Sequence, residues 1–271
     1  MQKFHKTVLI TGASSGMGRK TAIFLAQQGF MVYAGSRTPE KLFEIENEQL
    51  KAVFLDLTNP QTITLLLESI GKVDVLVNNA GYGLVSTVEE LDENEMFNQF
   101  NVNVFGVLRV SKVVIPLMRK QGGGVIINIS SFLGKIGLPL LTMYNASKYA
   151  VEGITDSLRY ELRDFNIRVH SIMPGFFDTQ FARSNLVTNV ETFNKNSPYA
   201  KMVSNLAPNI VEQINGGNDA KEVAMLILEI IEDENFPARA TVGEKSQKFI
   251  PMRRELSDED FERRVREYYT F

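Results

Sequence analysis

Residues 7–20 read TVLITGASSGMGRK, and this stretch decides the fold. It opens with a short apolar run, 7–11, of the kind that forms a strand buried on both faces of a sheet. A glycine-rich turn follows at once, and apolar residues at helical spacing then predict a helix over 17–28. A strand, such a turn and a helix in direct succession are the context in which a dinucleotide is bound.

Three glycines, Gly12, Gly16 and Gly18, set the spacing of this turn. Glycine permits a tight turn at the strand end, lets the backbone approach a pyrophosphate closely, and allows the helix to pack tightly on the strand. The first N–H groups of the helix would then face the phosphate. A plain glycine turn is the alternative, but the strand and helix on either side favour phosphate binding.

The same alternation continues along the chain. Short apolar runs predict strands, and the amphipathic stretches between them predict helices, an order typical of a parallel sheet covered on both faces. We therefore expect an α/β fold: a Rossmann-type, doubly wound parallel sheet of about seven strands with helices on both faces. The predicted strands are 7–11, 30–35, 51–55, 73–77, 124–130, 167–172 and 239–243, and the predicted helices are 17–28, 39–47, 60–70, 90–120, 142–164 and 219–233.

We expect one domain over 1–271, because no linker, repeat or low-complexity segment divides the chain. The stretch 176–217 lacks a clear pattern and is longer than a compact connection requires, so we interpret it as an irregular substrate lid. The last residues, about 257–269, predict a surface helix with Ser257 as its N-cap.

Composition excludes several kinds of site. The protein has 271 residues, a net charge of −3 and no basic stripe, which argues against nucleic acid as a partner. Without cysteine there can be no disulfide, thiolate metal site or cysteine nucleophile. Two histidines, His5 and His170, are too few for a metal site. The chain shows neither a signal peptide nor a long apolar run, so we expect a cytoplasmic protein without a membrane span.

The end of the second predicted strand bears on which dinucleotide is bound. An acidic residue about twenty positions after the turn usually binds the ribose 2′-hydroxyl of NAD. Here Ser36 and Arg37 occupy that place. A guanidinium can bind the 2′-phosphate of NADP with two charge-assisted hydrogen bonds. Arg37 therefore favours NADP(H) over NAD; the alternative is an ordinary solvated arginine.

Several short motifs follow the turn in a fixed order. This series resembles the short-chain dehydrogenase/reductase family over nearly the whole chain to about residue 180, and is similar to its NADP-preferring, hydroxysteroid and retinol dehydrogenase-like members. It departs from some of those members because Ser14 and Ser15 stand where they carry a basic residue. The motifs are TGASSGMG, LDLT with Asp56, NNAG at 78–81, NVNVFG with Asn103, INISS with Ser131, YNASK with Tyr144 and Lys148, and MPGFFDT at 173–179.

The resemblance implies an oxidoreductase that transfers a hydride between NADP(H) and a carbonyl or secondary alcohol. It gives Tyr144 the role of general acid or base, and it places Ser131 on the substrate oxygen and Asn103 in a proton relay. Lys148 would bind the nicotinamide ribose and lower the pKa of Tyr144. The cofactor-binding residues that it implies are Gly12, Ser14, Ser15, Gly16, Met17, Gly18, Arg37, Asp56, Leu57, Asn79, Ala80, Gly81, Tyr144, Lys148, Pro174, Gly175 and Thr179.

The pair formed by Tyr144 and Lys148 also has a physical rationale. Four residues apart on a helix, the two side chains lie on one face. A lysine cation about 4 Å away supplies roughly the 4 kcal/mol needed to lower a phenol pKa from about 10 to about 7. The alternative from another class is an NADP-binding regulator or sensor without turnover. It would be expected to have lost part of the catalytic tetrad, which is complete here.

Substrate and partners are less constrained. Apolar residues in 176–217 and just before Tyr144 predict an apolar substrate, resembling the steroid, retinoid or lipid-like substrates of the family. The alternative is that they pack the lid on itself. Helices at 90–120 and 142–164 resemble those that form homodimers or homotetramers in many relatives, whereas other relatives are monomers. The apolar residues are Phe176, Phe177, Phe181, Leu186, Phe193, Tyr199, Met202, Leu206, Leu138, Leu140 and Met143.

Overall fold

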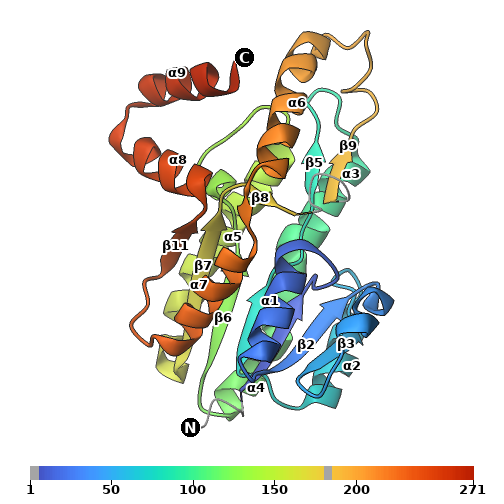
Figure 1. The fold of residues 1–271 in the computed structure, drawn as a ribbon, viewed down its shortest axis with the longest axis vertical. Coiled ribbons are helices and arrows are strands. Elements are labelled where there is room, and N and C mark those ends of the chain that lie inside the picture. Colours follow the sequence, from blue (N-terminus) through green and yellow to red (C-terminus); the bar gives the residue numbers. More distant parts are fainter. Residues whose placement is uncertain (1–5, 180–184) are drawn as a thin grey trace.

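The computed structural model describes residues 6–179 and 185–271. Its centre is a seven-stranded sheet in the order β11-β7-β6-β4-β1-β2-β3 (Figure 1). All six neighbouring pairs run parallel, which confirms the predicted doubly wound α/β fold. The strands are β1 (Thr7–Thr11), β2 (Met31–Ser36), β3 (Leu50–Phe54), β4 (Val75–Asn78), β6 (Gly124–Ile129), β7 (Ile167–Pro174) and β11 (Arg239–Val242).

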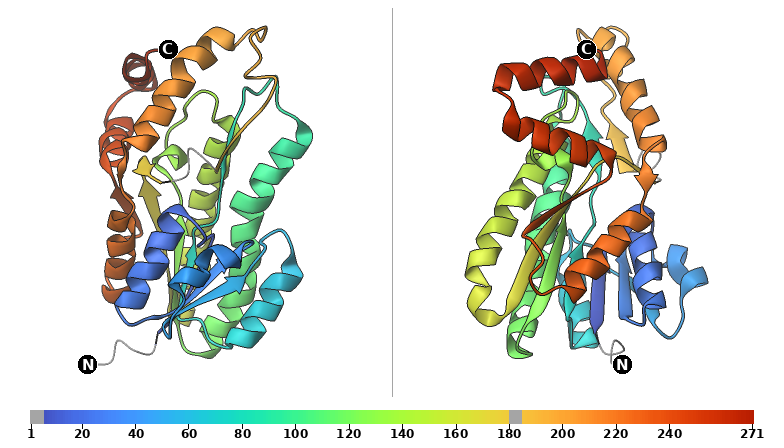
Figure 2. Two further views of the ribbon diagram at one scale, coloured as in Figure 1. Left: turned by 45° about the vertical axis from the view of Figure 1, so that its right-hand side comes forward. Right: turned by 60° about the vertical axis from the view of Figure 1, so that its left-hand side comes forward.

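Helices cover both faces of the sheet, α1 and α7 on one side and α2, α4 and α5 on the other (Figures 1 and 2). Strand β1 shows the reason. Val8 and Ile10 pack in the cluster beneath α1 and α7, while Leu9 packs beneath α2 and α4, because successive strand side chains point to opposite faces. The helices are α1 (Gly16–Gln27), α2 (Pro60–Ile70), α4 (Gly106–Lys120), α5 (Thr142–Glu161) and α7 (Lys221–Glu232).

A third apolar cluster lies beyond the carboxyl ends of the strands. It joins α6 (Ala200–Asn215), α8 (Glu244–Glu255) and α9 (Asp258–Tyr269) to the turn that follows β6. In Figure 1 α6 and α9 lie at the upper end of the molecule. Helix α9 confirms the predicted C-terminal helix, and the Ser257 side chain accepts a hydrogen bond from the N–H of Asp260 as its N-cap.

Two helices depart from the sequence expectation. The expected irregular structure over 176–217 is wrong for 200–215, which form α6. Helix α8 was also unexpected. Each contains an internal proline, Pro208 in α6 and Pro251 in α8, which reads as a helix-ending signal in sequence. The short strands β8 (Phe177–Asp178), β9 (Leu186–Thr188) and β10 (Asn218–Asp219) flank α6 and pair outside the main sheet, β8 with β10 and β9 with β5 (Gly83–Val85).

The region predicted as one helix over 90–120 begins at Glu93 and changes its winding in the middle. An α-helix, α3 (Glu93–Phe100), leads into a π-turn at Asn101–Phe105 and then into α4. By length and composition alone, Glu93–Lys120 would be long and apolar enough to cross a membrane, with a mean hydropathy of 1.4 over its most apolar window. In this fold α4 packs against the sheet and α2.

The remaining differences are small. The predicted helix at 39–47 is a 3-10 helix at Pro39–Ile45, with Pro39 at its first position. The predicted helix at 142–164 ends at Glu161 and is followed by one 3-10 turn, Arg163–Phe165.

Candidate active site

The glycine-rich turn leaves β1 in a conformation that only glycine adopts easily. Gly12 has φ +67° and Gly16 has φ +53°. A Cβ atom at Gly12 would lie 2.7 Å from the Cα of Ala80, and one at Gly18 would lie 2.5 Å from Nδ2 of Asn79. The turn is therefore held tightly against the loop that follows β4, and it has no room for a side chain at Gly12 or Gly18.

The amino end of α1 is open to an anion. The helix begins at Gly16, and within the described residues the side chain of its N-cap, Ser15, makes no capping hydrogen bond. The first N–H groups of a helix carry a partial positive charge and lack partners inside the helix. Ser14, Ser15 and Met17 are partly exposed around this end. These features fit a dinucleotide pyrophosphate.

The NNAG motif supports the turn from behind. The Nδ2 of Asn79 donates to the carbonyls of Thr11 and Gly12, at 2.9 and 3.1 Å. In return the Thr11 hydroxyl accepts from the N–H groups of Asn79 and Ala80, each at 3.0 Å. Asn79 and Ala80 thus hold β1, β4 and the turn in one arrangement at the switch point of the sheet, where strand order reverses.

Ser131 and Tyr144 meet at the carboxyl edge of the sheet. Ser131 lies just after β6 and caps the 3-10 turn Phe132–Gly134, where its Oγ accepts from the N–H of Leu133 at 3.1 Å. Tyr144 lies in the first turn of α5. Burial raises the pKa of Tyr144 to about 12, and a side-chain hydrogen bond with Ser131 opposes this rise. The phenol is therefore protonated throughout the neutral range in the protein alone.

Lys148 lies one helical turn after Tyr144, as the spacing predicted. Its Nζ is 5.6 Å from the centre of the Tyr144 ring and donates to the carbonyl of Ile129 at 2.9 Å. Burial lowers the pKa of Lys148 to about 8, and the charge of Glu152 opposes this change. The expected lowering of the Tyr144 pKa to about 7 by Lys148 is not found, because burial of the phenol outweighs every other influence on it.

Asn103 lies in the π-turn between α3 and α4, a kind of local rewinding that is frequent at functional sites. Its Oδ1 accepts from the N–H of Tyr82 at 3.1 Å, and its Nδ2 donates to the Tyr82 carbonyl and the Ser147 hydroxyl. A Cβ atom at Gly81 would lie 3.2 Å from Oδ1 of Asn103 and 3.7 Å from Nζ of Lys148. Gly81 is therefore in close contact with both side chains.

An apolar pocket opens beside these groups. In the described part of the chain its polar side chains are Ser130, Ser131, Tyr144 and Thr179, and no charged side chain lines it. The rest of the lining comes from α1, the turn after β6, the residue before α5, the segment from the end of β7 through β8, and from β9 and α6. These residues are Met17, Leu133, Leu141, Pro174, Gly175, Phe176, Phe177, Leu186, Ile210 and Ile214.

The sequence model of the short chain dehydrogenase family matches residues 6–189, which is well over half of the chain. The chain belongs to the short-chain dehydrogenase/reductase family. Its members are oxidoreductases that act on CH–OH and C=O groups with a nicotinamide cofactor.

The similarity to individual short-chain dehydrogenases covers nine tenths or more of the chain. A Bacteroides thetaiotaomicron protein named 3-ketodihydrosphingosine reductase is 36% identical over 255 residues, covering 90% of this chain and 93% of the relative. A Burkholderia phymatum short-chain dehydrogenase/reductase solved with NAD is 28% identical, with a TM-score of 0.77 over 97% of each chain. A Burkholderia cenocepacia short-chain dehydrogenase solved with NADP shares the fold, with 24% identity and a TM-score of 0.77 over 100% of each chain.

The other predicted cofactor residues of this short-chain dehydrogenase lie in three places. Thr179 lies against Gly16, where an added Cβ would be 3.4 Å away, and Pro174 and Gly175 line the pocket. Asp56 is partly exposed and accepts from the N–H and hydroxyl of Thr58. Leu57 is different, because its side chain is buried and packs against Gly106, so any contact with a ligand would come from its backbone.

The two residues at the end of β2 differ in their surroundings. Ser36 is buried, and its hydroxyl accepts from the N–H of Thr38 at 3.0 Å. Arg37 is exposed, and within 6–179 and 185–271 it makes no hydrogen bond or ion pair. Its guanidinium is therefore available to a ligand.

Sequence reasoning found only part of the apolar lining. Phe176, Phe177 and Leu186 line the pocket as predicted, whereas Phe193 is exposed and Leu206 is buried in the C-terminal cluster. Phe181 and His5 lie outside the described residues. The apolar residues of the segment are thus divided between the pocket, the C-terminal cluster and the surface. Tyr199, Met202, Leu138, Leu140 and Met143 are absent from the described lining.

The residues of α6 that line the pocket were missed. Val203, Leu206, Ile210 and Ile214 are the buried residues of this helix, and their spacing of three, four and four residues is a helical signal that could have revealed them. Ser130 was also missed as a lining residue. Its hydroxyl lies 3.5 Å from the carbonyl oxygen of Lys148, and nothing in the sequence separates it from neighbouring serines.

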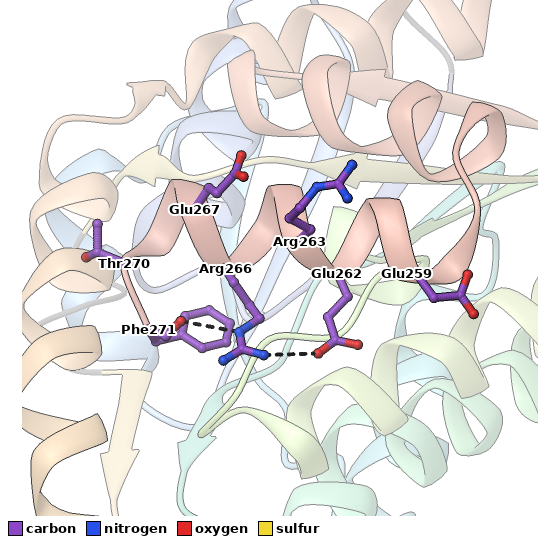
Figure 3. Close-up of a pocket in the computed structure, with 7 residues that line it drawn as sticks. All are labelled: Glu259, Glu262, Arg263, Arg266, Glu267, Thr270 and Phe271. Atoms are coloured by element: carbon purple, nitrogen blue, oxygen red, sulfur yellow. Dashed lines mark hydrogen bonds and ion pairs between the residues drawn. The ribbon is translucent and has the colours of Figure 1, made fainter.

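A second hollow lies on the outer face of α9 (Figure 3). Among the residues that line it, Arg266 lies 3.6 Å from Glu262 and donates to the carbonyl of Phe271 at 3.4 Å. It shares no residue with the apolar pocket. Among the residues that the structure describes, no group of three or more His, Asp or Glu side chains is arranged to hold a metal ion.

Proposed function

We propose that this protein is an NADP(H)-dependent reductase of an apolar, lipid-like ketone, with Tyr144, Ser131, Lys148 and Asn103 as its catalytic group. The observation that carries the proposal is the contact of Ser131 with Tyr144 at the wall of a pocket whose described lining has no charged side chain. An apolar wall with a few convergent polar groups suits an apolar substrate held by its one oxygen.

The nicotinamide cofactor supplies the hydride when it is bound. The Ser131 hydroxyl donates a hydrogen bond to the substrate oxygen and holds it beside Tyr144. Tyr144, protonated at neutral pH, donates its proton to the oxygen as negative charge develops there. Lys148 holds its ammonium group one turn away, where its charge favours the phenolate that remains. Asn103 fixes the Tyr82 backbone next to Gly81, which lies against Lys148, and supports the return of a proton to the site.

The protonation state of Tyr144 fits the role of proton donor. Its pKa of about 12 keeps the phenol protonated at pH 7 in the cofactor-free protein, the state from which a proton is given to a ketone oxygen. The competing proposal is an NADP-binding sensor without turnover. Such a protein would be expected to lack one of the four catalytic side chains, and all four are present in this sequence.

The substrate class rests on the pocket and on one relative. The described lining is formed largely by Leu, Ile, Phe and Met side chains. A relative with 36% identity is named for reducing a long-chain ketone, 3-ketodihydrosphingosine. We therefore favour a ketone with a long alkyl chain over a steroid or retinoid.

The exposed apolar side chains bear on how the subunits assemble. We propose pairing of subunits through the helices that include Phe97, Phe105 and Tyr149, whose side chains are all exposed in the single chain. A homodimer or homotetramer would cover these apolar groups. We also propose a cytoplasmic location.

Turnover tests the proposed reaction. Wild-type protein should oxidise NADPH, followed at its absorbance, when it is given long-chain 3-keto compounds. Tyr144→Phe should lose at least about a thousandfold in kcat while binding NADPH with little change, because phenylalanine keeps the ring and loses only the proton. If wild type binds NADPH and turns over no carbonyl in a panel of long-chain, steroid and retinoid ketones, the sensor is the better proposal.

Cofactor choice needs its own experiment. Arg37 is exposed and without an ion pair in the described structure, and β2 ends without a carboxylate. A charge-assisted contact with the 2′-phosphate is worth about 1.5–3 kcal/mol, so NADPH should bind about ten to a hundred times more tightly than NADH. The double variant Ser36→Asp, Arg37→Leu should reverse this order. Equal dissociation constants in the wild-type protein would rule out this role for Arg37.

A further inference from the structure

One buried carboxylate near this site has no role in the steps above. Glu152 follows Lys148 by four residues, so Tyr144, Lys148 and Glu152 lie on one face of α5 on successive turns. Glu152 is only 3% exposed. A buried carboxylate is costly unless it is paired and hydrogen-bonded, so its partners indicate what keeps it there.

Both oxygens of Glu152 are used by other elements. Oε1 accepts from the Ser171 hydroxyl on β7 at 2.7 Å, and Oε2 accepts from Nε of Arg239 on β11 at 2.7 Å. Oε2 also lies 3.1 Å from Nζ of Lys135. Glu152 therefore joins α5 to two strands and to the segment that follows β6.

The contact with Lys135 reaches the catalytic serine. Lys135 is the residue that ends the short 3-10 turn Phe132–Gly134, and Ser131 is the residue that begins it. The turn packs closely on α5, because a Cβ atom at Gly134 would lie 3.0 Å from the carbonyl oxygen of Lys148. The ion pair between Lys135 and Glu152 thus holds the Ser131 turn against the helix that carries Tyr144.

The charges around Glu152 nearly balance. Lys135 and Arg239 face it, and Arg239 also pairs with Asp156 on the next turn of α5, at 2.6 Å. Although burial opposes ionisation, hydrogen bonds from Arg239 and Ser171 and the charge of Lys135 hold the pKa of Glu152 below its ordinary value. On the other side of Glu152 the same negative charge opposes the fall in the pKa of Lys148 that burial causes.

We propose that Glu152 is a positioning residue of this site, whose carboxylate holds the Ser131 turn against α5 and places a negative charge one turn behind Lys148. This inference rests on the proposed function for its catalytic consequence. The two effects of Glu152 can be measured separately. The ion pair with Lys135 affects the position of Ser131, and the negative charge affects the protonation of Lys148.

The charge effect can be measured without turnover. In cofactor-free protein, the titration of Lys148 can be followed by NMR of the lysine side chains, with Lys148→Met to assign the signal. Glu152→Gln keeps the size of the side chain and removes its charge. We expect it to lower the titration midpoint of Lys148 by about 0.5 pH unit or more, since a nearby opposite charge shifts a pKa by up to about 1–3 units.

Asp156→Asn is the matched control, because it makes the same change of charge on the same helix, one turn farther from Lys148. Asp156 has a side chain that is 48% exposed, so solvent screens it. We expect a clearly smaller shift from this variant. Equal shifts in the two variants, or no shift in Glu152→Gln, would overturn the electrostatic part of the proposal.

The positioning effect is read from turnover. With Glu152→Gln the alkaline limb of the kcat profile should move to lower pH, because Lys148 loses its proton earlier, and kcat should fall about tenfold to a hundredfold as Ser131 loses its support. Glu152→Asp, which restores the charge, should return the limb toward its wild-type position. A lower kcat with an unmoved limb would reduce Glu152 to a purely structural residue.

A second variant guards against misfolding of Glu152→Gln. Lys135→Met keeps the Glu152 charge and removes its link to the Ser131 turn. It should lower kcat without lowering the titration midpoint of Lys148, and wild-type kcat in this variant would overturn the link. Failure of the wild-type protein to reduce any carbonyl would instead sink the proposed function, while the NMR midpoints would still decide whether Glu152 acts on Lys148.

Discussion

The pKa values of Tyr144 and Lys148 are shifted in opposite directions from the ordinary values of these side chains, and burial is the main cause of both shifts. The pKa of Tyr144 rises to about 12 and that of Lys148 falls to about 8. Burial disfavours the charged form, which is the phenolate for tyrosine and the ammonium for lysine. At pH 7 both side chains are therefore protonated, the arrangement that a proton donor and its supporting cation require.

The lowered pKa of Lys148 makes a prediction about stability. The unfolded chain binds a proton at Lys148 up to a pKa of 10.5, whereas the folded protein releases it at about 8. Between these values the unfolded state binds more protons, so folding stability rises with pH across this window and is reduced below it.

We expect Lys148→Met to remove that rise. The free energy of unfolding of wild type minus that of Lys148→Met should increase by about 3 kcal/mol between pH 8 and pH 10.5, at about 1.36 kcal/mol per pKa unit. Urea unfolding of both proteins at a series of pH values measures the difference, and other titrating groups cancel between the two. A difference independent of pH would contradict the lowered pKa.

At the scale of elements, single segments place several functional groups at once. Helix α5 carries Tyr144, Lys148 and Glu152 on one face, and the turn after β1 brings its backbone against the loop after β4. In both cases the local backbone geometry sets where the side chains or backbone groups point. Contacts with distant elements then set how close these groups come to their partners.

Two costs of placing a side chain at Gly12 can be measured separately: the contact of its Cβ with Ala80 and the left-handed backbone conformation. Gly12 and Gly71 have nearly the same φ, +67° and +70°, but no described atom lies within 4 Å of a Cβ placed at Gly71. Gly71→Ala should therefore cost only the left-handed conformation, about 1–2 kcal/mol. Gly12→Ala should cost about 1–3 kcal/mol more, because its Cβ meets the backbone of Ala80. Urea unfolding compares the two; equal losses of stability would mean that the turn can move away from Ala80.

At the scale of the whole molecule, the C-terminal helices reach the active site through a chain of aromatic rings. Tyr269 stacks on Phe249, with ring centres 5.9 Å apart, and Phe249 stacks on Phe132 at 6.2 Å. Phe132 directly follows Ser131, and it meets Phe176 of the pocket edge-to-face at 5.2 Å. The last residues of the chain thus support the walls of the pocket, although they lie outside it.

Tyr269 gives a test of this support. Its side chain is fully buried, and its hydroxyl has no hydrogen-bond partner among the described residues. Tyr269→Phe should leave stability unchanged or raise it by up to about 1 kcal/mol, because it removes an unpaired buried polar group. Tyr269→Ala should cost about 3–5 kcal/mol and lower turnover, since it leaves a cavity beside Phe249.

Thermal unfolding of the two Tyr269 variants, together with turnover for Tyr269→Ala, measures these effects. A loss above about 1 kcal/mol in Tyr269→Phe would show that the hydroxyl has a partner after all. Wild-type turnover in Tyr269→Ala, despite lower stability, would separate the C-terminal cluster from the active site.

Features that depend on neighbours along the chain could be predicted from the amino-acid sequence. Apolar runs mark all seven strands of the main sheet, glycine spacing marks the turn after β1, and the spacing of Tyr144 and Lys148 places them on one helix face. These are patterns of local period, which the backbone imposes on any strand, turn or helix. They were sufficient for the fold, and the order of the motifs then gave the resemblance to the family.

Features that depend on packing between distant segments became known from the three-dimensional structure alone. The raised pKa of Tyr144, the bond of Lys148 to the Ile129 carbonyl and the three partners of Glu152 all come from other elements. Helix α6 was hidden because Pro208 is a helix-ending signal in sequence, whereas burial of Leu206, Ile210 and Ile214 against the C-terminal cluster outweighs it in the fold. Burial and charge pairing act through space, and periodicity along one segment carries no record of what will pack against it.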